Sequence, residues 1–192
     1  NGFYKGRYIN PFKDHDDGYD SLTFDEIFTN SSNIGTIKIF QDLSMKSYYR
    51  KIQRFGFGIK SNISLMDEHK GDIKTLKYFK NNIRDLASAS IGQSILVTNL
   101  QMALAYSSIA NGGFMLKPQI IKEINCDSYS KKIYVPTILY KTMNEETSKI
   151  ALNLLEKTVR EGTAKKTYLN DLNIGGKTGT AEIWDLNNKE YL

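Results

Sequence analysis

The chain has 192 residues and a mass of 21.9 kDa, of which 40% are hydrophobic, 24% charged and 11% aromatic. This composition excludes disordered, collagen-like and low-complexity proteins, and no window approaches the roughly 20 apolar residues of a membrane-spanning helix. The chain starts at Asn1 without a methionine or a signal-peptide pattern, so we expect a fragment whose targeting segment lies outside it.

The net charge of +5 and the pI near 9.1 raise the question of nucleic-acid binding. Only five of the 26 basic residues are arginine, and acidic residues lie between the lysines, so this class of function is disfavoured. The single cysteine, Cys126, excludes an internal disulfide and has no partner with zinc-ligand spacing. We therefore expect no structural zinc site.

Residues 1–20 predict loop and short strand. Asp14 does not begin a calcium loop, because Gly18 takes the place of an oxygen ligand and Tyr19 that of the required glycine. A capping box of Thr23 and Glu26 then predicts a short helix.

Four further helices follow from apolar periodicity and capping residues. They cover 34–41, then 45–55 after the cap Ser44, then 99–110 after Thr98, and last a helix from the cap Asn144 to Gly162. The third of these is apolar enough to be buried nearly all round. Residues 60–82 are weakly patterned.

Strands are expected in the second half of the chain. Residues 120–135 predict a β-hairpin with a polar turn at 127–132, and residues 172–184 predict a strand that turns at Asn187 and Asn188 into another one. We therefore expect the second strand to be cut off at Leu192.

Gly176-Lys177-Thr178-Gly179-Thr180 is the segment most open to a chemical interpretation. A phosphate-binding loop is rejected, because Asp171 replaces the first glycine and no helix follows. A strand edge in an acyl-transfer cleft fits better: its N–H groups face a carbonyl oxygen, and a lysine with two hydroxyls binds a carboxylate. The alternative is that Lys177 is a solvated edge charge.

Such a cleft needs a partner, and Ser31-Ser32-Asn33 offers one in a turn between two helices, where a hydroxyl and an amide can point into the cleft. Serine–lysine, Ser-x-Asn and Lys-Thr-Gly elements together are typical of penicillin-binding proteins and related β-lactamases. The alternative is that Ser31 or Asn33 only caps the following helix.

The sequence resembles the transpeptidase domain of class B penicillin-binding proteins, most closely the division type, over nearly the whole chain. The resemblance rests on the order and spacing of short motifs, with about 145 residues between Ser-x-Asn and Lys-Thr-Gly. The motifs are Ser31–Gly35, Tyr49–Gly58, Ser90–Gln93, Val97–Ala103, Ile109–Gly113, Pro118, Gly162–Ala164 and Gly175–Ala181.

The resemblance implies an α+β fold like that of the serine β-lactamases, here a single partial domain over 1–192 that is incomplete at both ends. It implies serine acyl transfer on D-Ala-D-Ala stem peptides, with β-lactams as mimics and with no need for a metal or a cofactor. Carried over by motif, Ser31 assists proton transfer and Asn33 binds the donor's amide. Lys177, Thr178, Gly179 and Thr180 hold the substrate, and Lys177 tunes the field around Ser31.

The chain departs from the family pattern at the nucleophile. Residues 1–30 contain no serine followed by lysine three positions on, and the one such pair, Ser128 and Lys131, lies in the polar hairpin turn, where we expect a surface role. The nucleophile is therefore expected before Asn1, and the fragment alone is expected to be inactive.

Two other functions stay open: a penicillin-binding fold that serves as a non-catalytic scaffold, and a β-lactamase, disfavoured for want of a deacylating glutamate loop. The resemblance also implies septal wall synthesis with divisome membrane partners such as a glycosyltransferase. The parent is then anchored in the inner membrane, with this portion on the periplasmic side.

Overall fold

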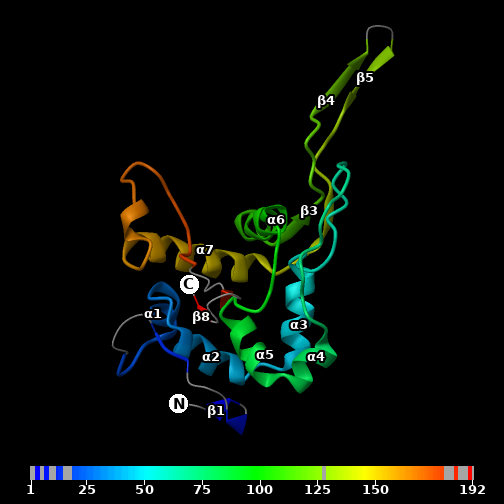
Figure 1. Cartoon of the computed structure of the whole chain (residues 1–192). Coiled ribbons are helices and arrows are strands. Elements are labelled where there is room, and N and C mark those ends of the chain that lie inside the picture. The colour runs from blue at the N-terminus through cyan, green and yellow to red at the C-terminus, as the bar shows by residue number, and fades with distance from the viewer. Residues whose placement is uncertain are drawn as a thin grey trace. The chain divides into compact units, whose positions relative to one another are not determined.

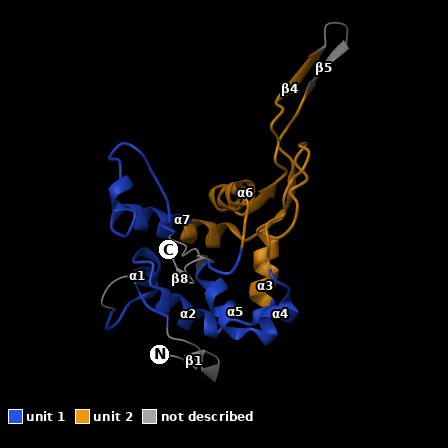
Figure 2. Cartoon of the chain, viewed as in Figure 1, with its two compact units in different colours: residues 1–46, 74–95, 152–192 blue, residues 47–73, 96–151 orange. Residues whose placement is uncertain are grey.

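The computed structural model describes residues 3–4, 7–8, 12–14, 19–126, 129–179, 184–185 and 190–191, and Figure 1 traces its elements in chain order. The chain divides into two units, each made of separate segments (Figure 2). Unit 1 comprises residues 1–46, 74–95 and 152–192, and unit 2 comprises 47–73 and 96–151. Helices and antiparallel strand pairs occur together, so the predicted α+β class is confirmed.

Unit 1 is mainly helical. Its elements are α1 (Phe24–Thr29), α2 (Asn33–Gln41), α4 (Leu76–Asn81), α5 (Ile83–Ser90), the end of α7 (Glu145–Arg160) and the 3₁₀ turn η1 (Lys165–Thr167). Helix α5 contacts both α2 and α4, and α1 contacts α2. The buried apolar side chains of this unit are Ile37, Phe40, Phe79, Leu86, Ala87, Ala89, Leu154, Leu155, Val159 and Ala164.

Helices α4 and α5 were not predicted from the sequence. They are six and eight residues long. Helix α4 lies within residues 60–82, which are weakly patterned in the sequence, and α5 follows directly after them. Thr75 caps α4 by accepting a hydrogen bond from the Tyr78 N–H at 3.2 Å. Burial of Phe79 and Leu86, both fully inaccessible, then supplies the stabilisation that such short helices lack by themselves.

Unit 2 combines helices with two strand pairs. It contains most of α3 (Met45–Arg54), then α6 (Asn99–Ala110), β3 (Phe114–Leu116), β4 (Glu123–Cys126), β5 (Tyr129–Ile133), β6 (Ile138–Lys141) and the start of α7. Strands β4 and β5 form the predicted hairpin, with Glu123 opposite Ile133. The pair β3–β6, with Met115 opposite Tyr140, was not predicted.

Helix α6 begins with the predicted capping box of Thr98 and Gln101. The prediction that it is buried nearly all round is wrong, because Met102 is 41% and Tyr106 is 38% exposed. One face alone, formed by Gln101, Ala105 and Ser108, is buried. Two of these residues are small, so this face packs closely while the larger side chains lie outward.

Gln101 is 2% exposed and ties three loop segments of unit 2 together. Its Nε2 donates to the carbonyls of Gly56 at 3.2 Å, of Ile59 at 2.9 Å and of Lys70 at 2.9 Å. Its Oε1 accepts the Thr98 N–H at 2.9 Å, so the amide is satisfied at both ends. Gly56, at the predicted end of α3, has the expected positive φ of 86°.

The C-terminal segment differs from its prediction. Residues 172–179 form no strand, because none of the described strands pairs with them, and the Gly176 N–H bonds to the Leu155 carbonyl of α7 at 3.1 Å instead. Short antiparallel pairs do occur at both ends: β1 (Phe3–Tyr4) with β2 (Arg7–Tyr8), and β7 (Trp184–Asp185) with β8 (Glu190–Tyr191). The predicted turn at Asn187 and Asn188 lies outside the described residues.

Among the helices that the structure describes, none combines the length and the apolar content needed to cross a bilayer.

Candidate active site

Ser31 lies in the turn between α1 and α2 with an unusual backbone. Helix α1 ends at Thr29, and Ser31 has a φ of 56°, in the left-handed region that favours glycine. This conformation is unfavourable by about 1–2 kcal/mol for a residue with a side chain, and such strain concentrates at functional sites.

Ser32 caps the N-terminus of α2. It is 2% exposed, and its hydroxyl accepts a hydrogen bond from the Gly35 N–H at 2.9 Å. The same hydroxyl donates to the Asp14 carboxylate at 2.9 Å, whose other oxygen accepts the Ile34 N–H at 3.1 Å. A carboxylate at this position also stabilises the positive end of the helix dipole. The start of α2 is thus held by the hydroxyl of Ser32 next to it and by the carboxylate of Asp14, 18 positions before Ser32.

Because Ser32 is the cap, the alternative prediction that Ser31 or Asn33 serves as the cap is wrong. Asn33 is the first residue of α2, and its amide donates to the Lys13 carbonyl at 3.0 Å. Ser31 is left to bond elsewhere, and it does so with the C-terminal segment of unit 1.

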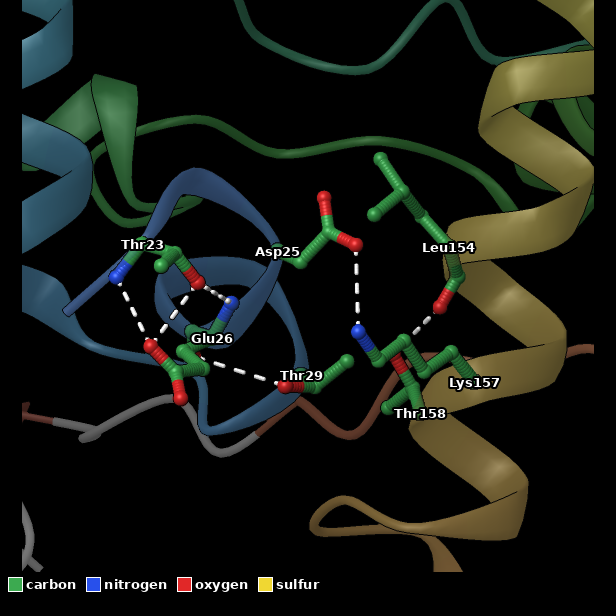
Figure 3. A network of polar contacts seen from close by, with 7 residues as sticks. All are labelled: Thr23, Asp25, Glu26, Thr29, Leu154, Lys157 and Thr158. Atoms are coloured by element: carbon green, nitrogen blue, oxygen red, sulfur yellow. Dashed lines mark hydrogen bonds and ion pairs between the residues drawn. The ribbon is translucent and has the colours of Figure 1, made fainter.

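Figure 3 shows the polar contacts that position α1 within unit 1. The predicted capping box is confirmed: the Glu26 N–H donates to Thr23 Oγ1 at 3.3 Å, and the Glu26 carboxylate accepts the Thr23 N–H at 2.8 Å. Asp25 forms an ion pair of 3.1 Å with Lys157 of α7. A partly exposed pair adds at most about 1 kcal/mol. Its effect is to fix α1, and with it the turn that carries Ser31.

Four polar groups meet at Ser31. Its Oγ lies 3.1 Å from Thr178 Oγ1 and 3.2 Å from Thr163 Oγ1, and it accepts a hydrogen bond from Lys177 Nζ. Thr163 Oγ1 and Thr178 Oγ1 are 2.7 Å apart. The structure therefore brings Ser31 together with Lys177 and Thr178, which lie 146 and 147 positions further along the chain. Asn33 has no hydrogen bond to this group among the described residues.

Lys177 is held in a partly buried position. Its Nζ lies 5.9 Å from the centre of the Phe28 ring and donates to the Thr178 carbonyl at 3.2 Å. Burial lowers the pKa of the Lys177 ammonium below its ordinary value of 10.5. A lysine of this kind gives up a proton more readily than a solvated one, so the interpretation of Lys177 as a purely solvated edge charge does not describe its environment.

The remaining predicted residues are placed as follows. Gly179 is exposed, and no atom of the described residues lies within 4 Å of the position that a Cβ would take, which leaves the backbone there open to a ligand on the described side. Thr180 lies outside the described residues, as does Ser128.

Thr163 is the residue of this group that the sequence did not single out as a site residue. It appeared within the motif Gly162–Ala164, without a role. A threonine directly after the end of an amphipathic helix carries no local signal of chemistry, because its partners Ser31 and Thr178 are far away in the sequence.

A cation and three hydroxyls at hydrogen-bond distance can bind a carboxylate and pass a proton. In the described part of the chain, no group of three or more His, Cys, Asp or Glu side chains is arranged to hold a metal ion. The described groups that contact the Ser31 hydroxyl are two hydroxyls and an amine.

Residues 1–192 match the family model described as the penicillin binding protein transpeptidase domain, and the chain belongs to this family. Stage V sporulation protein D of Bacillus subtilis is 33% identical over 168 residues, which cover 86% of this chain and 26% of that protein. The peptidoglycan D,D-transpeptidase FtsI homolog of Mesostigma viride is 29% identical over 178 residues, covering 84% of this chain and 29% of its own length. The chain thus spans less than a third of either relative.

Solved structures show the same fold. Penicillin binding protein 3 of Mycobacterium tuberculosis in complex with aztreonam has a TM-score of 0.84 at 25% identity, with 98% of this chain and 43% of that chain covered. The complex of the same protein with ampicillin has a TM-score of 0.80 at 26% identity, with 88% and 39% covered. These matches confirm the penicillin-binding fold.

Proposed function

We propose that the protein carrying this chain is a peptidoglycan D,D-transpeptidase that works by serine acyl transfer and is inhibited by β-lactams. The observation that carries the proposal is the meeting of Ser31, Lys177 and Thr178 in one hydrogen-bonded group. Membership of the transpeptidase family and a relative named as a D,D-transpeptidase support it. The fold is shared with structures that hold ampicillin and aztreonam.

Each residue has a proposed role. Ser31 Oγ gives a proton to the leaving amine, and Lys177, whose pKa is lowered by burial, supplies one to Ser31. Lys177, Thr178 and Thr180 bind the terminal carboxylate of the substrate, and Gly179 leaves room for its approach. Asn33 binds the amide side of the donor, which requires its side chain to leave the Lys13 carbonyl when substrate binds.

The nucleophile is assigned to a Ser-x-x-Lys pair that precedes Ser31 in the whole protein. Residues 1–30 contain no such pair, and this family places the nucleophile before Ser-x-Asn. Residues 1–192 alone are then inactive in acyl transfer.

The setting follows from the same proposal. Peptidoglycan lies outside the cytoplasmic membrane. The protein is therefore anchored in that membrane, and this domain acts on its periplasmic side. Septal wall synthesis, with a glycosyltransferase as a membrane partner, is the proposed task, because the motifs of this chain follow the division-type pattern.

The test is to react the whole protein with a fluorescent penicillin and to map the labelled peptide by mass spectrometry. We expect label on a serine before Asn1, none on residues 1–192 alone, and slower labelling of Lys177→Ala and Ser31→Ala. Lys166→Ala is the matched control, because Lys166 is exposed on η1 of the same unit.

Other outcomes contradict the proposal in distinct ways. A whole protein that is never labelled is a penicillin-binding fold kept as a scaffold. Label on Ser128 means that the motif order was misread. Rapid release of the label by hydrolysis identifies a β-lactamase rather than a transpeptidase.

A further inference from the structure

Thr163 occupies the centre of the polar group around Ser31. Its hydroxyl lies 2.7 Å from Thr178 Oγ1 and 3.2 Å from Ser31 Oγ, and it donates to the Thr29 carbonyl at 3.3 Å. The Thr163 hydroxyl therefore lies within hydrogen-bond distance of both other hydroxyls of the group and of the carbonyl of the last residue of α1.

The loop that carries Thr163 is docked on the end of α1. The Thr163 N–H donates to the Thr29 carbonyl at 3.1 Å, so this carbonyl accepts both hydrogen bonds from one residue. A Cβ at Gly162 would lie 2.4 Å from the same oxygen, and only glycine permits this approach. The docking fixes Thr163 relative to Ser31, which lies two positions after Thr29.

The hydrogen bonds of the group can form a chain in which every donor points the same way, from Lys177 toward the Thr29 carbonyl. A carbonyl only accepts, so the Thr163 proton points to Thr29, and Thr163 Oγ1 accepts from Thr178. Thr178 Oγ1 in turn accepts from Ser31, and Ser31 Oγ accepts from Lys177. Each hydroxyl then donates once and accepts once, and such chains strengthen each hydrogen bond in them.

We propose that Thr163 is a positioning residue, which orients the hydroxyls of Thr178 and Ser31 by anchoring their hydrogen bonds on the Thr29 carbonyl. The inference rests on the proposed function and adds a residue to it. Thr163 keeps its own proton and its hydrogen bonds throughout. The bond that Ser31 donates to Thr178 breaks when Ser31 gives its proton to the leaving amine, while a lone pair of Ser31 Oγ stays directed toward Lys177 Nζ. Without that anchor the hydroxyls of Ser31 and Thr178 can turn, and fewer encounters are productive.

The test compares two variants of Thr163 in the whole protein. Thr163→Val keeps the shape and removes the hydroxyl, whereas Thr163→Ser keeps the hydroxyl and removes a methyl group. Stopped-flow reaction with a fluorescent penicillin separates the dissociation constant of the first complex from the acylation rate constant. Thr167→Val is the matched control, because the Thr167 hydroxyl bonds only to the Ala164 carbonyl among the described contacts, at 2.8 Å.

We expect Thr163→Val to lower the acylation rate constant by about three- to tenfold, the range for one net hydrogen bond, with the dissociation constant nearly unchanged. Thr163→Ser should restore most of the rate, and Thr167→Val should react like the wild type. A thermal midpoint measured for each variant shows whether a loss of rate merely follows a loss of folded protein.

Three results overturn the inference. The first is a Thr163→Val variant that reacts at the wild-type rate, the second is a Thr163→Ser variant as slow as Thr163→Val, and the third is a loss that lies wholly in the dissociation constant. In each case the wild type is still acylated and the proposed function stands. If the wild type itself is never acylated, the proposed function fails and the inference fails with it.

Discussion

Gly35 of α2 packs directly against Ile27 of α1. A Cβ at Gly35 would lie 2.7 Å from Ile27 Cγ1 and 2.9 Å from Ile27 Cγ2, which is closer than carbon atoms approach without displacement. Both atoms are bonded to the branched Cβ of Ile27, so they cannot swing away as the tip of a long side chain can. This contact sets how closely the two helices that flank Ser31 approach each other.

Gly35→Ala is therefore expected to destabilise the protein. Overpacking costs about 1–3 kcal/mol, and the better helix propensity of alanine offsets about 1 kcal/mol of it, which leaves a net loss of up to about 2 kcal/mol. Denaturant unfolding measures this loss. In the double variant with Ile27→Ala the clash is absent, so the two effects should be non-additive by at least about 1 kcal/mol; additive effects would show that the two residues do not meet.

The Ser31→Gly variant should be more stable to unfolding than the Ser31→Ala variant. The left-handed backbone costs alanine about 1–2 kcal/mol, whereas the larger loss of backbone entropy on folding costs glycine about 0.5–1 kcal/mol. The free energy of unfolding of Ser31→Gly should therefore be about 0.5–1 kcal/mol higher than that of Ser31→Ala. Both variants lose the hydroxyl and should react slowly with penicillin. Equal stability of the two would mean that the backbone at this position relaxes.

The local features of the fold could be predicted from the sequence, because their partners lie three or four positions apart. The capping boxes at Thr23 and Thr98 and the cap of α7 at Asn144, whose Oδ1 accepts the Thr147 N–H at 2.7 Å, are of this kind. The hairpin β4–β5 is also local. Helices α4 and α5 are only six and eight residues long, so the local cap at Thr75 does not suffice and both depend on burial within unit 1.

The site was predicted through the resemblance and not through periodicity. Nothing local connects Ser31 with Lys177, so only the order of family motifs placed them together. Ser32 shows the limit of that approach: the motif drew attention to its neighbours Ser31 and Asn33, whereas the cap is made by Ser32 and by Asp14, which belongs to no motif.

Gln101→Ala should be strongly destabilising. It leaves three carbonyls, of Gly56, Ile59 and Lys70, without the amide donor that they share, and it removes the partner of the Thr98 N–H. We expect a loss of about 3 kcal/mol, measured by denaturant unfolding. Gln119→Ala is the control, since Gln119 is exposed and bonds to the Val135 carbonyl at 3.1 Å; its effect should stay within about 0.5 kcal/mol.

Lys177→Met should change how stability depends on pH. Because burial lowers the pKa of Lys177 in the folded protein, the unfolded chain binds more protons between that lowered pKa and 10.5, and wild-type stability rises with pH in this window. Below the window the penalty of burying the cation is present in full. The stability of the wild type minus that of Lys177→Met should therefore increase as pH is raised toward 10.5.

Unfolding curves of the two proteins at several pH values measure this difference. Lys165→Met, which removes an exposed lysine of η1, gives the baseline for the loss of one positive charge. A difference for Lys177 that does not exceed this baseline would show that the folded state does not disfavour the ammonium.

The hydrogen bonds of Ser31 to Thr163 and Thr178 join residues 132 and 147 positions apart, and unit 1 is assembled from three stretches of chain. Contacts of such long sequence separation carry a large loop-closure entropy and form slowly. During synthesis Ser31 leaves the ribosome long before Thr178 does, so the nascent chain holds the first half of the site without the second. The strained turn at Ser31 can reach its final form only when nearly all of the 192 residues have been made.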